Sequence, residues 1–152
     1  MRFVSLAFTL LVVSTISLAA GSSSSTKQEQ PGYASFQKGQ RAVKSGDFPQ
    51  ALGHFESALA EDANNPDYHN MYAYSLRHLE RNDEALQHYQ QALALKPRHL
   101  GANEYIGELY LKLGNLAKAE EHLKVLDQAC YFGCEEYDEL KEKIEQYKRR
   151  NT

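Results

Sequence analysis

The sequence predicts an all-α fold built from stacked helix pairs, and three observations lead to this prediction. The chain aligns with itself at a spacing of 34 residues, which places Ala51, Ala85 and Ala119 in one column. Within each copy, apolar residues recur at intervals of three and four residues, a spacing that places them on one face of an α-helix. Turn-forming residues such as Gly46 and Pro97 separate these stretches. A repeat of this length indicates units that bury their apolar faces against their neighbours.

Residues 1–20 are expected to form a secretory signal peptide. Arg2 precedes an apolar run, Phe3–Val13, and small residues follow it, which is the order found in a cleaved signal. The run is well short of the roughly 20 residues that span a bilayer as a helix. We therefore expect an exported, periplasmic protein with no membrane insertion after signal cleavage; secretion or a membrane tether are the alternatives. Residues 21–31, rich in serine and glutamine, are expected to be a disordered linker.

Three repeats follow this linker, at residues 32–65, 66–99 and 100–133. Each is expected to contain two antiparallel helices, with small residues where the helices approach closely and large residues that fill the space between neighbouring pairs. The small column holds Gly39, Ala73 and Gly107, and the large column holds Phe55, Tyr89 and Leu123. Pro66 is well placed to begin a helix, because the first helical position needs no amide donor.

One more helix is predicted for residues 134–150. An apolar stripe runs along it, consisting of Tyr137, Leu140, Ile144 and Tyr147. Acidic residues crowd its start and the basic run Lys148–Arg150 closes it, as the helix macrodipole prefers. A terminal helix with a polar outer face is what a stack of repeats needs to cover its last apolar surface.

These columns resemble the tetratricopeptide repeat family, whose pattern is W-x2-L-G-x2-Y, then A-x3-F, then P. The second-helix half of the pattern matches well, as at Ala51 and Phe55, and Pro97 keeps the proline. In the first-helix half, Ser35 and His69 stand where the family often has tryptophan. The resemblance implies a right-handed superhelical stack of three helix pairs plus a C-terminal capping helix. It also implies a non-catalytic protein–protein interaction module, similar to small exported bacterial members of the family.

In this family the first helices of the repeats line a concave groove that contacts ligands. The resemblance carries these positions onto Phe36, Gln40 and Lys44 in the first repeat, Asn70, Tyr74, Arg77 and His78 in the second, and Glu104, Glu108 and Lys112 in the third. Members that clamp a chaperone's C-terminal carboxylates have lysine and asparagine where Phe36 and Gln40 stand, so that ligand class is not expected. The mixture of aromatic, cationic and anionic residues favours an extended or helical peptide, or a protein partner. Alternatively, some of the aromatic residues pack between helices.

The sequence carries no motif that predicts catalysis or a bound cofactor. It lacks HExxH, CxxCH, GxSxG and a glycine-rich phosphate loop. The formal net charge is −3 without a dense basic cluster, so no nucleic-acid partner is expected. His54, His88 and His122 recur at the repeat spacing. Packed helices lie about 8–10 Å apart and a zinc–nitrogen bond is about 2 Å, so these histidines are not expected to share a metal. No enzyme activity is expected.

Cys130 and Cys134 are the only cysteines of the chain. Within an unbroken helix, residues four apart have Cβ atoms about 5–6 Å apart, whereas a disulfide needs about 3.5–4.5 Å. Gly133 lets the backbone leave the helix, and an exported protein favours the oxidised form. A structural disulfide is the main hypothesis, and free thiols are an alternative. Another alternative makes the protein a thiol-dependent redox or metal-handling assembly factor that uses this pair. A third is a homo-oligomer formed through an exposed repeat face.

Overall fold

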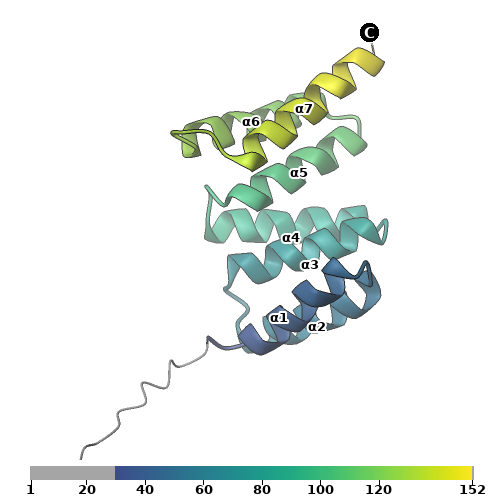
Figure 1. Cartoon of the computed structure of the whole chain (residues 1–152), viewed down its shortest axis with the longest axis vertical. Helices are drawn as coiled ribbons and strands as arrows, with labels where there is room; N and C mark the ends of the chain where they lie inside the picture. The colour runs from purple at the N-terminus through teal and green to yellow at the C-terminus, as the bar shows by residue number, and fades with distance from the viewer. Residues whose placement is uncertain (1–29, 152) are drawn as a thin grey trace, which may run out of the picture.

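The computed structural model describes residues 30–151 of the chain. The predicted signal peptide and most of the predicted linker lie outside this range. Within it the fold is all-α, and the helices are α1 (Tyr33–Lys44), α2 (Phe48–Glu61), α3 (Pro66–His78), α4 (Asn82–Leu95), α5 (Leu100–Lys112), α6 (Leu116–Ala129) and α7 (Glu135–Arg150). They stack in chain order, from the purple α1 and α2 at one end to the yellow α7 at the other (Figure 1). The predicted stack of helix pairs with a C-terminal helix is confirmed.

Polar residues in the turns explain where three of these helices begin. The Asp47 side chain accepts a hydrogen bond from the backbone N–H of Gln50, and the Asn115 side chain accepts one from Lys118. The Asn65 side chain accepts from two backbone N–H groups of the first turn of α3, directly before a proline at its first position. Such caps satisfy amide donors that have no partner within the helix.

Close helix packing depends on the glycine column that the sequence predicts. A Cβ atom added to Gly39 would lie 2.4 Å from Cε1 of Phe55, whose side chain is fully buried. The same addition at Gly107 would lie 2.6 Å from Cδ2 of Leu140. Gly39 thus faces a large residue of its own repeat, whereas the large residue that covers Gly107 belongs to α7. Leu123 of the third repeat is only partly buried.

The C-terminal helix α7 covers the last apolar face of the stack. Leu140 and Ile144 are buried, and Tyr137 and Tyr147 pack against the same core cluster. This core cluster runs from the second repeat to α7, and a smaller one around Phe55 joins α1, α2 and α3. Among residues 30–151, no helix is both long enough and apolar enough to cross a bilayer.

Candidate functional site

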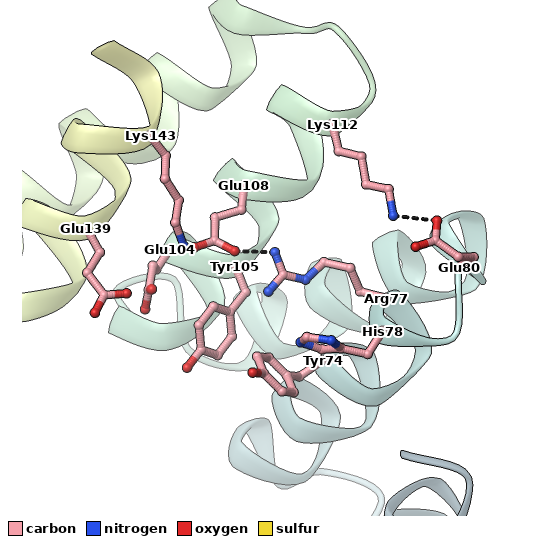
Figure 2. A pocket seen from close by; sticks show the side chains of 10 residues that line it. All are labelled: Tyr74, Arg77, His78, Glu80, Glu104, Tyr105, Glu108, Lys112, Glu139 and Lys143. Atoms are coloured by element: carbon pink, nitrogen blue, oxygen red, sulfur yellow. Dashed lines mark hydrogen bonds and ion pairs between the residues drawn. The ribbon is translucent and has the colours of Figure 1, made fainter. Parts of the chain in front are cut away.

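Three neighbouring helices, α3, α5 and α7, enclose a hollow of about 450 Å³ that we call the groove. Six of the predicted ligand-contacting residues line it: Tyr74, Arg77, His78, Glu104, Glu108 and Lys112. Four residues that were not predicted complete the lining: Glu80, Tyr105, Glu139 and Lys143. Figure 2 shows these side chains converging from the three helices and from the turn after α3.

Arg77 lies at the centre of the groove and contacts groups on two helices. Its guanidinium donates to the carboxylate of Glu108 on α5, across the boundary between two repeats. The same guanidinium carbon lies 5.4 Å from the ring centroid of Tyr74 and 5.5 Å from that of Tyr105. A cation over an aromatic face is attracted by the ring quadrupole. The Arg77 side chain is only 14% exposed, so α3 and α5 together fix its position.

Glu108 extends this contact to α7, because it also accepts from the ammonium group of Lys143. One carboxylate therefore joins three helices, with Arg77 on one side and Lys143 on the other (Figure 2). At the far end of the groove, the ammonium group of Lys112 donates to Glu80 at 2.5 Å, in a more exposed ion pair. Each of these three cations already has an anionic partner.

The carboxyl groups of Glu104 and Glu139 meet between α5 and α7. Glu104 is buried, and its burial, its hydrogen bond with Glu139 and the nearby Glu108 raise its pKa to about 8. The raised pKa therefore favours the protonated form of this carboxyl group. Oxygen atoms of Glu104, Glu108 and Glu139 all lie within 4.8 Å of one another.

Aromatic rings form the side of the groove nearest the N-terminus. The ring of Tyr74 lies 4.9 Å from that of Tyr105 and 4.5 Å from that of His78, measured between centroids. Phe48 of α2 stacks on His78 at 4.1 Å. Burial, followed by the charge of Arg77, lowers the pKa of His78 and so favours the neutral imidazole. These rings offer flat apolar area next to the charged centre.

The other four predicted groove residues lie elsewhere. Phe36 is a core residue, 9% exposed, with its ring 5.6 Å from that of Phe55 and 4.8 Å from that of Tyr68. The side chain belongs to the core cluster around Phe55, so it does not line the groove. Asn70 is also buried, at 5% exposed. Gln40 and Lys44 are exposed on α1 and do not line the groove.

Helical periodicity could have revealed three of the four missed residues, namely Tyr105, Glu139 and Lys143. Tyr105 precedes Glu108 by three residues and Lys112 by seven, so helical periodicity alone places all three on one face. Glu139 and Lys143 are four apart on α7 and share a face in the same way. The sequence does not indicate that the capping helix also forms a wall of the groove. Its apolar stripe predicts only that the helix covers the core.

The three recurring histidines are partly buried on the second helices. Nδ1 of His88 lies 3.0 Å from Nδ1 of His69, and Nδ1 of His122 lies 2.9 Å from Oδ1 of Asn103. Burial is the main cause that lowers the pKa of both His88 and His122. Each of these two rings therefore links the two helices of its own repeat, which is a structural role.

The cysteine pair lies in the turn between α6 and α7. Sγ of Cys130 and Sγ of Cys134 are 2.05 Å apart, and their Cα atoms are 5.7 Å apart. Gly133 has a φ of +84°, a conformation that glycine adopts readily. Between the cysteines, Tyr131 and Phe132 are 91% and 103% exposed. The turn thus presents two aromatic rings to solvent, and neither residue lines the groove.

Comparison with known families identifies the class of this protein. Two tetratricopeptide repeat models match it, one over residues 36–99 and the other over residues 76–144. Together they span all three helix pairs and more than half of α7. The chain belongs to the tetratricopeptide repeat family, so the resemblance seen in the sequence is confirmed.

Individual relatives agree with this assignment. The chain is 29% identical over 85 residues to a TPR repeat-containing thioredoxin, TTL4, of Arabidopsis thaliana; the match covers 56% of this chain but 12% of that protein. The translocator chaperone SycD of Yersinia enterocolitica has a TM-score of 0.70 at 16% identity, covering 78% of this chain and 84% of that one. The yeast Sti1 TPR2B domain, solved in a complex with pHsp70, has a TM-score of 0.69 at 18% identity, covering 76% and 96%. These structures share the fold.

Proposed function

We propose that this protein is a non-catalytic interaction module that binds a peptide or a protein segment in the groove between α3, α5 and α7. The observation that carries the proposal is the hollow of about 450 Å³, into which aromatic and charged side chains of three helices converge. Tyrosine and arginine side chains dominate the energy of many protein interfaces, and Tyr74, Arg77 and Tyr105 are neighbours here. The same surface offers both apolar contact and hydrogen bonding.

The groove is fixed before a ligand arrives. Glu108 joins Arg77 of α3 to Lys143 of α7, and these charged contacts hold the three helices in one arrangement. A surface that is already ordered loses little side-chain freedom when it binds. Affinity for a short extended segment is therefore compatible with a site that lacks a deep cavity.

Solved relatives support this use of the fold. The first TPR domain of Spaghetti was solved with the HSP90 peptide SRMEEVD, and it matches this chain with a TM-score of 0.69 at 22% identity. We do not propose that peptide as the ligand here. The family positions that would clamp its terminal carboxylate are occupied by Phe36, which is buried, and by Gln40.

The experiment that tests the groove is a crosslinked pull-down with the mature protein as bait. The groove variant Tyr74→Ala/Tyr105→Ala should lose a partner that the unchanged protein retains. The matched control, Leu95→Ala/Leu113→Ala, removes two exposed apolar residues elsewhere and should retain the partner. Thermal melting by circular dichroism shows whether each variant is folded. Equal retention by both variants, with both folded, would exclude the groove as the binding surface.

We further propose that the protein works in an exported compartment, the periplasm. The support is the N-terminal order of a basic residue, an apolar run and small residues. A disulfide between Cys130 and Cys134 would be stable in such an oxidising compartment. Cell fractionation and N-terminal sequencing of the mature protein test this. A mature chain that begins near residue 20 is expected, whereas a cytoplasmic protein with an intact N-terminus would contradict the proposal.

A thiol-dependent redox or metal-handling role is the second candidate. The observation that favours it is the position of the cysteine pair in an exposed turn, where both cysteines are only partly buried. Thiol titration of protein purified without reductant distinguishes the two roles. An interaction module should show no free thiol and keep partner binding in the variant Cys130→Ser/Cys134→Ser. Loss of activity in that variant without loss of folding would favour the redox role.

A further inference from the structure

Two histidine rings of the second repeat contact each other between α3 and α4. Nδ1 of His69 lies 3.0 Å from Nδ1 of His88, and Nε2 of His69 lies 2.8 Å from the backbone carbonyl oxygen of Ala63. A carbonyl oxygen only accepts hydrogen bonds, so Nε2 of His69 carries the hydrogen of that bond. His69 is 7% exposed. Both of its ring nitrogens are thus held by protein atoms.

These contacts determine where the hydrogens lie in the neutral pair. A neutral imidazole carries one N–H group. Because His69 has its hydrogen on Nε2, its Nδ1 is the acceptor, and Nδ1–H of His88 donates to it. One added proton can bind Nε2 of His88 without breaking this bond. With two added protons, all four ring nitrogens carry hydrogen, and two N–H groups face each other. The pair therefore keeps its bond with one positive charge but not with two.

The third repeat contains the equivalent contact with one residue changed. At the spacing of 34 residues, three pairs of positions coincide: His69 with Asn103, His88 with His122, and Ala63 with Pro97. Nδ1 of His122 lies 2.9 Å from Oδ1 of Asn103, and Nδ2 of Asn103 donates to the carbonyl oxygen of Pro97 at 3.0 Å. An amide oxygen accepts from a charged imidazolium as well as from a neutral ring. This link consequently survives protonation of its histidine, and the link in the second repeat does not survive full protonation.

The charges around His88 do not compensate for the lost bond. Burial, followed by the charge that His69 carries when it is protonated, lowers the pKa of His88. Glu84, one turn earlier on α4, acts in the opposite direction, but it is exposed and pairs with Arg81. The neighbouring helices add two further titratable groups, Tyr72 of α3, whose ring lies edge-on to His88 at 4.6 Å, and Glu56 of α2, whose charge acts on Tyr72.

We propose that the His69–His88 pair is an acid-sensitive link, which holds α3 to α4 while at least one ring is neutral and opens when both rings are protonated. Below the ordinary histidine pKa of about 6.5, the unfolded chain binds a proton on each ring, whereas the folded pair keeps its bond with only one. The unfolded state therefore binds more protons, so lowering the pH favours unfolding. The last turn of α3 carries Arg77 and His78 of the groove, so the link acts on a helix that forms the groove.

The test compares the unchanged protein with two reciprocal variants. His69→Asn gives the second repeat the acceptor that the third repeat has, and Asn103→His does the reverse. Urea denaturation followed by circular dichroism measures the unfolding equilibrium constant of each protein from about pH 7.5 to about pH 5. Between about pH 6 and about pH 5, this constant should rise about threefold to tenfold more in the unchanged protein than in His69→Asn, tenfold being the value for one proton. In Asn103→His it should rise by a similar factor more than in the unchanged protein.

Comparison between the variants separates the pair from the other titratable groups. Glu104, whose raised pKa makes acid stabilising, is present in all three proteins, so its contribution cancels in the comparison. Equal pH dependence in the unchanged protein and His69→Asn would overturn the inference. If His69→Asn does not fold, Asn103→His decides in its place, and a pH dependence equal to that of the unchanged protein would then overturn it.

Nitrogen-15 NMR of the histidine rings tests the link without a substitution. At about pH 7.5, His69 should carry its hydrogen on Nε2 and His88 on Nδ1. At about pH 5.5, the folded protein should keep one ring of the pair neutral, or should lose the nuclear Overhauser contact between the two rings. Two protonated rings that retain this contact, or a neutral His69 with its hydrogen on Nδ1, would contradict the proposal.

Discussion

Arg77 and Glu108 form an ion pair that crosses the boundary between the second and third repeats, and Lys143 of α7 completes it from the other side. Both members of the pair are largely buried, with side chains 14% and 10% exposed. Removing one partner of a buried pair leaves the other charge without compensation, which costs about 3–5 kcal/mol. The pair therefore sets both the shape of the groove and part of its stability.

Glu108→Ala should destabilise the protein more than Arg77→Met does. Loss of Glu108 removes the anionic partner of both Arg77 and Lys143, whereas loss of Arg77 leaves Glu108 bound to Lys143. We expect a decrease of about 3 kcal/mol in the free energy of unfolding for Glu108→Ala and a smaller one for Arg77→Met. Urea denaturation followed by circular dichroism measures both values. The reverse order would show that Lys143 contributes little to holding Glu108.

Two glycine substitutions within helices should have opposite effects. In Gly39→Ala the new methyl group would lie 2.4 Å from the buried ring of Phe55. Overpacking of this kind costs about 1–3 kcal/mol. Gly53→Ala in α2 meets no atom within 4 Å and should stabilise by about 0.4–1 kcal/mol, because alanine is the better helix former. Thermal melts of the two variants test whether the close packing of helices requires glycine at position 39. Equal melting temperatures would contradict this requirement.

The disulfide should contribute modestly to stability and act mainly on α7. Closing so short a loop restricts the unfolded chain by about 2 kcal/mol. Cys130→Ser/Cys134→Ser should lower the free energy of unfolding by about that amount, and reductant should lower it equally in the unchanged protein. Amide hydrogen exchange should accelerate first in α7, next to the severed link. Identical stability with and without reductant would mean that the bond makes no contribution.

Stability should fall as the pH rises through neutrality, because of Glu104. Its pKa is about 8 in the folded protein against an ordinary value of 4.5. Between these values the folded state holds a proton that the unfolded state has released, so raising the pH favours unfolding. We expect a loss of about 1 kcal/mol between pH 7 and about 9. In thermal melts recorded across this pH range, Glu104→Gln should make the stability depend less on pH. An unchanged slope would mean that other titratable groups cause the pH dependence.

The core was easier to predict from sequence than the groove. The repeat spacing identified the buried columns, because each repeat meets the same packing problem, as at Gly39 and Phe55. Equivalent positions need not face the same surroundings at the ends of the stack. Phe36 was expected in the groove but is buried, because α1, the first helix of the stack, turns this side chain between Phe55 and Tyr68.

The groove's charge pattern could not be read from one repeat at a time. Arg77 lies on α3, Glu108 on α5 and Lys143 on α7. In the sequence, each of these residues looks like an ordinary charged residue on a helix surface. Their meeting depends on the close stacking of α3, α5 and α7, which the self-alignment does not reveal for α7. The raised pKa of Glu104 has the same origin: two separate helices bring its carboxyl group close to that of Glu139, and Glu104 is buried there.

Because α7 both covers the core and supplies Glu139 and Lys143 to the groove, one wall of the groove is synthesised after the three helix pairs. During translation, the three helix pairs are synthesised while α7 is still missing, and Glu108 then lacks its lysine partner. The groove becomes complete only after residues 135–150 have emerged and docked. A truncation before α7 would remove one wall of the groove together with the cover of the core.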